Sequence, residues 1–355
     1  VWVFYGSGAG LHAAGEQVFD QDSFPGDHGG TETGDQFGYA LAAGDLDADG
    51  FDDLAIGTPF ENSPEPLGTC GFDLSCDDHG AFHVVFGSAA GLDFDRTYST
   101  GSSFSQGDGK GFALAVGDFD GNPSAGAELA VASPGSFDSS LGGADHTGRV
   151  ALYRFDPVSV MAPLGSFSSD PEEVDAQWGW ALGGGKLGTG GSRAIAVGAH
   201  LSDVAGSNQA GRATVVDPEE IEPHGDLVQT DFGMAGNGGD DHFGAALAVG
   251  DFDGDGFDDL AIAAPEKNDG GVADSGRVYV AFGSASGPDT SQFEILSIAD
   301  FAGSTPATGD AFGTALAAGD YDGDGFDDLF FGAPGRGSDD RGFVYFVHGT
   351  AAGLA

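Results

Sequence analysis

Short apolar runs recur along the chain, and glycine, aspartate and proline separate them. One set reads FGYALAAGD at 37–45, LAIGTP at 54–59, AFHVVF at 81–86 and, more weakly, FDRTYS at 94–99. Apolar runs of this length, bounded by turn residues and rich in β-branched and aromatic side chains, are typical of strands. No window combines a helical period with helix caps. The pattern predicts an all-β chain built from four-stranded units.

The same order of segments returns along the chain. An aromatic–Gly pair, an acidic loop eight residues later, a G/A-x-P ending and a β-rich run follow one another from Phe37, Phe243 and Phe312. Two weaker copies begin at Lys110 and Trp178. The five starts are 73, 68, 65 and 69 residues apart, and residues 1–11 match the third segment of a further copy. Repeated four-stranded units of this length are the signature of a β-propeller, whose blades pack radially.

We therefore expect one propeller domain over residues 1–355. It holds a partial repeat at 1–34 and repeats that start near 35, 108, 176, 241 and 310, the last of them incomplete. Counted this way, the chain has 21 strands: two, then four sets of four, then three. A ring of six or seven blades needs more strands, so we expect a longer native chain or another segment to complete it.

Each acidic loop places carboxylates at alternate residues. Three loops are complete: Asp45, Asp47, Asp49 and Asp53; Asp251, Asp253, Asp255 and Asp259; Asp320, Asp322, Asp324 and Asp328. The backbone carbonyls of Phe51, Phe257 and Phe326 complete the expected ligand sets. Alternate residues of a tight loop can turn carboxylates inward, which gives the oxygen-only shell that Ca²⁺ prefers. Without a cation such carboxylates repel one another. The loops predict three calcium sites.

An EF-hand is excluded, because its bidentate Glu at loop position twelve is replaced by Ile56, Ile262 or Phe331. The second repeat is degenerate: it keeps Asp118, Asp120 and Asn122, and Glu128 aligns with the last Asp, so we expect weaker binding there. The third repeat has Lys186 in place of the first Asp, and we expect a fixed positive charge instead of an ion. The remaining loop aspartates, Asp52, Asp258 and Asp327, are interpreted as solvated.

The net charge of the chain limits the classes of partner that it is expected to bind. The chain has 57 acidic and 11 basic residues and a formal net charge of −46. Nucleic acid and anionic membrane surfaces need basic patches, so neither is an expected partner. The acidity fits a cation-binding protein, a protein of high-salt surroundings, or a surface kept soluble by charge. No apolar run is long enough to span a membrane, and the chain starts at Val1, which is consistent with an upstream segment.

Cys70 and Cys76 are the only cysteines. A pair this close in a Gly/Pro/Asp-rich loop predicts a disulfide and an oxidising compartment. The alternatives are free thiols or a zinc site, for which His79 is the nearest further ligand.

The fixed order of aromatic–Gly pair, acidic loop, GAP-like ending and GxVYVF run resembles the FG-GAP repeat of integrin α-subunit propellers and of bacterial secreted proteins. This resemblance implies that the acidic loops join the first two strands of each blade on the lower face. It also implies an extracellular or cell-surface setting, with partners bound by the loops of the upper face. These upper-face loops are 60–79, 135–147, 201–210, 266–275 and 335–341.

Catalytic motifs such as G-x-S-x-G, H-E-x-x-H and the P-loop are absent from the sequence. The expected function is therefore a non-enzymatic, calcium-stabilised extracellular propeller that binds a protein partner in adhesion or cell-surface assembly. One alternative is a lectin-like, glycan-binding propeller. Another is a polysaccharide-active enzyme, for which the upper-face histidines would be needed: His28, His79, His146, His200 and His242. Four aspartates stand two residues before the aromatic position, where we expect turn caps: Asp35, Asp108, Asp241 and Asp310.

Overall fold

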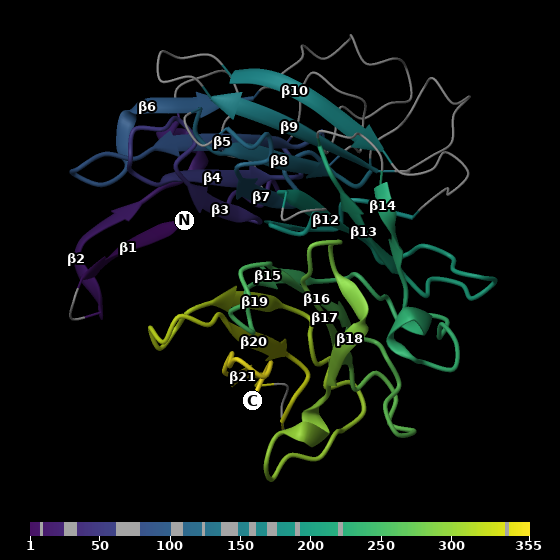
Figure 1. The fold of residues 1–355 in the computed structure, drawn as a ribbon. Helices are drawn as coiled ribbons and strands as arrows, with labels where there is room; N and C mark the ends of the chain where they lie inside the picture. The colour runs from purple at the N-terminus through teal and green to yellow at the C-terminus, as the bar shows by residue number, and fades with distance from the viewer. Residues whose placement is uncertain are drawn as a thin grey trace. The chain divides into compact units, whose positions relative to one another are not determined.

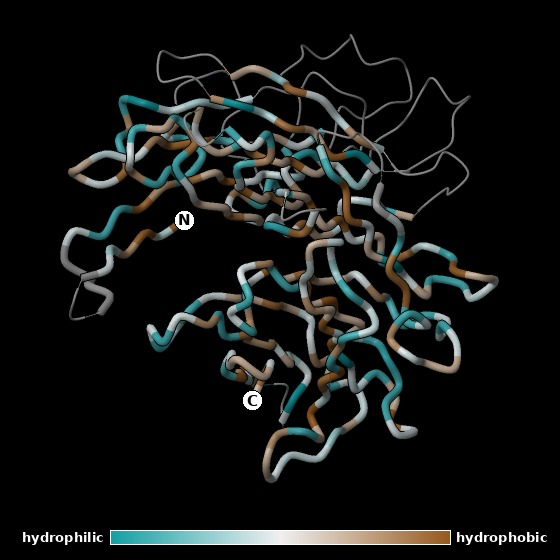
Figure 2. The backbone as a smooth tube through the Cα atoms, in the orientation of Figure 1, coloured by the Kyte–Doolittle hydropathy of each residue, from teal (hydrophilic) through white to brown (hydrophobic). Residues whose placement is uncertain are grey.

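The computed structural model describes residues 1–7, 10–24, 34–61, 79–100, 109–122, 125–135, 148–155, 161–168, 176–188, 192–218, 223–337 and 341–355. They form two compact units. The first comprises Val1–Asp118 with Asn122–Ser168, and the second comprises Phe119–Gly121 with Ser169–Ala355. Hydrophobic stretches alternate with hydrophilic ones along the chain, as the strand pattern requires (Figure 2).

The first unit contains a hairpin and two four-stranded sheets (Figure 1). The hairpin pairs β1 (Trp2–Ser7) with β2 (Gly10–Val18), and a 3₁₀ turn, η1 (Gln21–Ser23), follows. The next sheet has the order β3 (Leu41–Gly44), β4 (Asp53–Thr58), β5 (Ala81–Phe86) and β6 (Asp93–Ser99). The other has the order β7 (Leu114–Gly117), β8 (Glu128–Ser133), β9 (Arg149–Phe155) and β10 (Met161–Ser168).

The second unit contains two four-stranded sheets and one of three strands. They are β11 (Ala181–Gly185), β12 (Ala194–Ala199), β13 (Arg212–Val216) and β14 (Pro223–Leu227); β15 (Leu247–Gly250), β16 (Asp259–Ala264), β17 (Arg277–Phe282) and β18 (Asp289–Leu296); and β19 (Leu316–Gly319), β20 (Asp328–Ala333) and β21 (Phe343–Val347). Two 3₁₀ turns, η3 (Gln229–Phe232) and η4 (Ile298–Asp300), precede the aromatic–Gly pairs of the last two sheets.

The described residues thus hold 21 strands and no α-helix. Neighbouring strands within each sheet are antiparallel and follow one another in the chain, which is the meander of a propeller blade. The prediction of an all-β fold with four-stranded propeller blades is confirmed. The sheets that begin with β7 and β11 show that the two weaker copies of the repeat also form such blades.

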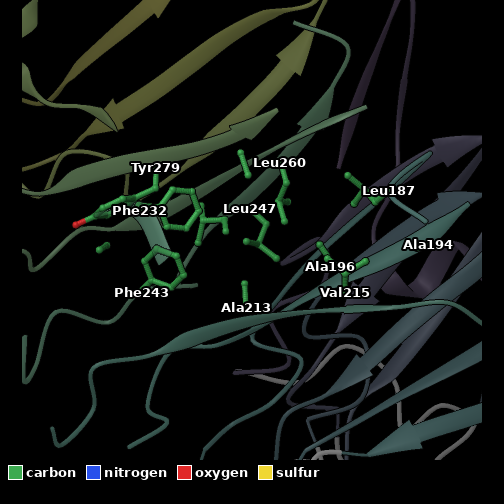
Figure 3. Packing of buried hydrophobic residues seen from close by; sticks show 13 residues of the cluster. Leu187, Ala194, Ala196, Ala213, Val215, Phe232, Phe243, Leu247, Leu260 and Tyr279 are labelled. Atoms are coloured by element: carbon green, nitrogen blue, oxygen red, sulfur yellow. The ribbon is translucent and has the colours of Figure 1, made fainter. Parts of the chain in front are cut away.

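Successive blades pack through their innermost strands. In the first unit β3 contacts β7, and in the second β15 contacts both β11 and β19. Figure 3 shows the core between the β11–β14 and β15–β18 blades, where Phe232, Phe243 and Tyr279 lie close to Leu247. Small residues of the other blade, such as Ala196 and Ala213, belong to the same core. The combination of small and large residues lets these two blades approach closely and buries the sheet faces that they turn toward each other.

The aromatic–Gly pair is fixed by packing and by backbone conformation. Phe243 is fully buried, and its ring centroid lies 5.2 Å from that of Tyr279. Gly244 has φ +90°, and a Cβ atom there would lie 2.2 Å from the backbone oxygen of Arg212 in the preceding blade. Only glycine allows this conformation together with this approach. The pair therefore sets where one blade meets the next.

The three-stranded sheet leaves one apolar face uncovered among the described residues. Val344 and Phe346 of β21 are 73% and 47% exposed. Their counterparts on β17, Val278 and Val280, are fully buried in the core that the β15–β18 and β19–β21 blades share. The uncovered face has the chemistry of a blade-packing surface.

Candidate metal centres

Each acidic loop of the three complete repeats joins the first two strands of a blade, and its own backbone orients the carboxylates. In the loop between β15 and β16, Asp251 accepts a hydrogen bond from the Gly256 N–H at 3.0 Å. Asp253 accepts one from the Asp255 N–H at 3.1 Å, and Asp255 accepts one from the Phe257 N–H at 2.8 Å. These turns leave the other carboxylate lone pairs available to a cation.

The same hydrogen bonds recur in the other two complete loops. In the first loop, the N–H of Gly50 donates to Asp45, that of Asp49 to Asp47 and that of Phe51 to Asp49. In the last loop, the N–H of Gly325 donates to Asp320, that of Asp324 to Asp322 and that of Phe326 to Asp324. These six distances are 3.0 to 3.2 Å. Three loops far apart in the sequence therefore share the same three hydrogen bonds from backbone to carboxylate.

Carboxylate oxygens converge in four loops. The groups whose ligand atoms lie within 4.8 Å of one another are Asp45, Asp47 and Asp53; Asp118, Asp120 and Glu128; Asp251, Asp253 and Asp255; and Asp320, Asp322 and Asp324. The expected ligands Asp49, Asp259 and Asp328 are not members of these groups, and no histidine of the described residues belongs to one. The loops that the sequence singled out are thus the places where the described part of the chain gathers acidic oxygens.

The last aspartate of each complete loop holds two backbone segments together. Asp259 is fully buried, and its two oxygens accept hydrogen bonds from the N–H groups of Phe252 at 2.7 Å and Gly283 at 2.6 Å. Asp53 and Asp328 accept the equivalent bonds in their own blades. Burial raises the pKa of Asp53 to about 6 and that of Asp259 to about 7. Sequence reasoning assigned these residues as ligands only and missed that they tie the loop to the turn after the third strand.

The donor set fits a hard cation. Oδ1 of Asp251 and Oδ1 of Asp118 are buried and have no hydrogen-bond partner. A buried carboxylate oxygen without a partner is costly, and a bound cation would satisfy it. Carboxylates without nitrogen or sulfur ligands favour Ca²⁺ over transition metals.

The third repeat lacks the carboxylates, as expected, and its lysine lies beside the next loop. Nζ of Lys186 donates a hydrogen bond to the Gly256 carbonyl at 3.3 Å, and its backbone N–H donates to Asp258 Oδ2 at 2.7 Å. In the same way, the Asp251 N–H donates to Asp327 Oδ2 at 3.0 Å. The interpretation of Asp258 and Asp327 as solvated side chains is therefore wrong, because each links its loop to the loop of the preceding blade. Asp52 is exposed.

Two of the four aspartates that precede the aromatic position form buried ion pairs. Asp310 accepts a hydrogen bond from the Ala307 N–H at 2.6 Å, which caps a turn, and also pairs with Arg336 at 2.9 Å. Asp241 pairs with Lys267 at 2.7 Å. Each basic residue stands two positions after the proline of the GAP-like ending, a spacing that was present in the sequence but not recognised. Asp35 is buried, and Asp108 lies outside the described residues.

The predicted upper-face loops are described in part. In loop 201–210, the Asn208 carbonyl accepts a hydrogen bond from the Asp240 N–H at 2.9 Å. In loop 266–275, the Ser275 carbonyl accepts one from the Phe312 N–H at 3.1 Å. Both loops are therefore anchored to the segment that leads into the next blade. Residues 62–78 with Cys70 and Cys76, residues 136–147, His28 and His146 lie outside the described residues.

Two of the predicted upper-face histidines have their rings in contact. The ring centroids of His200 and His242 are 5.4 Å apart, and Trp180 lies 4.1 Å from His200. Burial lowers the pKa of His200 to about 3, with a smaller contribution from His242. His242 lies 3.1 Å from Glu266. A neutral histidine packed on a tryptophan is a core arrangement, and it offers no support for a catalytic centre.

Known proteins share this repeat. The FG-GAP repeat family profile matches residues 37–70, 243–281 and 312–347. Integrin alpha-PS2 of Drosophila melanogaster is 39% identical over 128 residues, which are 34% of this chain and 9% of that protein. Integrin alpha-V of Gallus gallus is 37% identical over 118 residues, or 32% of this chain and 10% of the relative.

A phosphatidylinositol-glycan-specific phospholipase D of Rattus norvegicus is 35% identical over 184 residues, which are 48% of this chain and 20% of the enzyme. The chain thus matches a fifth or less of the length of each of these relatives. Because one of them is named as an enzyme, the absence of catalytic activity stays a prediction. Among the described residues, no helix is long and apolar enough to cross a membrane. The matched repeats, the similarity to integrin α subunits and the blades with their acidic loops lead to one conclusion: the chain carries FG-GAP repeats and folds as propeller blades.

Proposed function

We propose that this chain is a calcium-stabilised extracellular β-propeller that acts as a binding module for a protein partner, in adhesion or in the assembly of a cell-surface complex. The observation that carries the proposal is the shared geometry of the three complete acidic loops, each placed between the first two strands of a blade. Similarity to integrin α subunits over about a third of the chain supports the adhesion role.

Calcium has a structural role in this proposal. The ligands of the three complete sites are the four aspartates of each loop and the carbonyls of Phe51, Phe257 and Phe326. Asp118, Asp120, Asn122 and Glu128 form a fourth, weaker site. Each loop follows an innermost strand of only four residues, β3, β15 or β19, which supplies little apolar surface of its own. An ion that joins four carboxylates would hold the hairpin in register and remove their mutual repulsion.

A protein partner is proposed to bind the loops at the opposite ends of the blades. Loops 201–210 and 266–275 are anchored through backbone hydrogen bonds to the next blade, so they present a preformed surface. A preformed surface binds without a large ordering cost. A Cys70–Cys76 disulfide would fix the longest of these loops, and it implies an oxidising, extracellular setting.

We also propose six or seven blades for the complete ring. Two features support this: the β1–β2 hairpin and the β19–β21 sheet have fewer than four strands, and the apolar face with Val344 and Phe346 is uncovered among the described residues. A further blade would bury that face as the β19–β21 blade buries Val278 and Val280.

The function is tested by binding of the fluorescently labelled chain to intact cells in the presence of Ca²⁺. The proposal expects binding that EDTA abolishes, that trypsin treatment of the cells removes, and that glycosidase treatment leaves intact. The Asp255→Asn variant should need more Ca²⁺ for the same binding. Asp289→Asn, which changes a half-buried carboxylate outside the acidic loops, should behave as the unmodified chain. Binding that glycosidase removes and trypsin spares would favour the glycan-binding alternative. No binding to any cell type tested would contradict the adhesion role.

A further inference from the structure

An arginine from the outer strand of the first complete blade occupies the acidic loop of that blade. Nη2 of Arg96, on β6, donates a short hydrogen bond to Asp47 Oδ2, and Nη1 donates to Asp49 Oδ2 at 3.2 Å. The Asp47 side chain is fully buried, and that of Asp49 is 29% exposed. The guanidinium also lies 5.1 Å from the centroid of the Phe86 ring on β5. It is therefore held by two carboxylates and one aromatic face.

The equivalent loop of the β15–β18 blade has no such arginine. Strand pairing defines the equivalent position, because Phe86 pairs with Asp93 at the start of β6 and Phe282 pairs with Asp289 at the start of β18. Three residues further on, β6 carries Arg96 and β18 carries Gln292. Gln292 donates a hydrogen bond to Asp289 on its own strand and is exposed. Two loops with the same ligand pattern thus differ by one positive charge.

The set of converging carboxylates also differs between these loops. In the loops without the arginine, the third aspartate, Asp255 or Asp324, belongs to the converging group. In the first loop Asp49 does not; the group consists of Asp45, Asp47 and Asp53. The side chain that is missing from the group is one of the two that Arg96 holds.

A second arginine repeats the arrangement in the degenerate loop. Nε of Arg154, on β9, donates a hydrogen bond at 3.0 Å to Oε1 of Glu128, whose side chain is fully buried. In each of the first two complete blades, a guanidinium therefore donates a hydrogen bond to an expected metal ligand of the acidic loop. In loop 251–259 the nearby cation is instead the Lys186 ammonium, which donates to the Gly256 carbonyl. In loop 320–328, Nδ1 of His348 lies within 3.4 Å of carboxylate oxygens of Asp322 and Asp328.

We propose that Arg96 is a built-in counter-cation of loop 45–53, which competes with Ca²⁺ for Asp47 and Asp49 and makes this site bind Ca²⁺ more weakly than loop 251–259. The inference rests on the proposed calcium function. Its physical basis is that a guanidinium partly neutralises the carboxylates and orients one of them away from the metal, so that the metal gains less by binding. At low calcium the arginine holds loop 45–53 in part and Ca²⁺ orders the loop fully, whereas loop 251–259 depends on the ion alone.

The test measures each loop separately. Hydrogen–deuterium exchange of the full chain is followed by mass spectrometry as free Ca²⁺ is varied, and the midpoint of protection is read for peptides that cover 45–53 and 251–259. The unmodified chain should show a higher midpoint for loop 45–53. Arg96→Gln should lower that midpoint by about fivefold. This factor corresponds to about 1 kcal/mol, the upper end of the range measured for surface ion pairs. Gln292→Arg should raise the midpoint of loop 251–259 by a similar factor.

A variant and a second readout separate competition from packing on Phe86. Arg96→Lys keeps a cation near the loop. Its Ca²⁺ midpoint for loop 45–53 should therefore differ less from the midpoint of the unmodified chain than the midpoint of Arg96→Gln does. The melting temperature of Arg96→Gln should fall in EDTA and recover in saturating Ca²⁺; a fall of equal size in both conditions would show a packing role and overturn the proposal.

Two further outcomes would also overturn it: equal midpoints for the two loops in the unmodified chain, or a midpoint for loop 45–53 that rises in Arg96→Gln. Failure of the calcium function looks different, because then no loop would gain protection at any Ca²⁺ concentration.

Discussion

Replacing Asp259 by Asn separates the two roles that the structure gives to the last residue of each acidic loop. Asp259 is fully buried and accepts hydrogen bonds from Phe252 and Gly283 with its two oxygens. Asparagine keeps one acceptor and turns an NH₂ group toward the other donor. One backbone N–H then stays buried without a partner.

The cost follows from this geometry. A buried donor without a partner costs about 1–3 kcal/mol, and the lost bond was to a charged acceptor, so we expect about 2–3 kcal/mol of destabilisation. For a folded unit of 150–250 residues, each kcal/mol lowers the melting temperature by about 2–4 °C, which gives about 5–10 °C. Because burial raises the pKa of Asp259 to about 7, the experiment belongs at pH 8, where the carboxylate is ionised.

The assay is differential scanning calorimetry of the chain in EDTA, so that metal binding makes no contribution. The matched control is Asp255→Asn, which removes an exposed carboxylate but keeps the oxygen that accepts the Phe257 N–H. Asp259→Asn should melt well below the unmodified chain, and Asp255→Asn close to it; both should lose part of the stabilisation by Ca²⁺. An Asp259→Asn variant that melts within about 2 °C of the unmodified chain in EDTA would refute the role of Asp259 as a link between two backbone segments.

Two further predictions concern the packing of the blades. Gly244→Ala should destabilise the chain by more than about 2 kcal/mol in chemical unfolding, because the residue has φ +90° and its Cβ would lie 2.2 Å from the Arg212 carbonyl oxygen. The control Gly236→Ala, at a site with open space and ordinary φ, should change the free energy of unfolding little. Equal effects of the two substitutions would contradict the role of Gly244 in blade packing. His200 should make folding pH-dependent. Its pKa is about 3 in the folded chain, below the ordinary value of 6.5, so the unfolded chain binds its proton first. The contribution is complete above pH 6.5 and is lost as the pH falls toward 3. Urea titrations between pH 4 and 8 should show a smaller acid loss for His200→Phe, and an unchanged slope would contradict burial of the neutral ring on Trp180.

Much of the fold could be predicted from the sequence because each blade is encoded locally. Alternating apolar residues specify the strands, and the repeat period places them in blades. The aromatic–Gly pair could be recognised for the same reason: Phe243 and Gly244 lie side by side in the chain, and their requirements for burial and for positive φ are visible at that position.

The contacts that join different segments could not be predicted in the same way. Asp258 and Asp327 look like solvated loop residues until the neighbouring blade supplies the N–H groups of Lys186 and Asp251. Arg96 is 47 residues away from Asp49, and nothing in the local pattern of β6 shows that its side chain reaches back to the acidic loop. Such contacts depend on the twist and packing of the strands rather than on a period.

Calorimetric titration of Ca²⁺ into the EDTA-treated chain, combined with thermal melts before and after, tests the central claim most directly. Three or four bound ions are predicted, with the weakest sites at the two loops that Arg96 and Arg154 contact. The melting temperature should rise by a large amount in Ca²⁺. Mg²⁺ should not reproduce this rise at the same concentration, because it demands a smaller octahedral shell. Absence of binding heat together with an unchanged melting temperature would mean that the acidic loops are charged surface turns, and the metal-stabilised propeller proposed here would have to be abandoned.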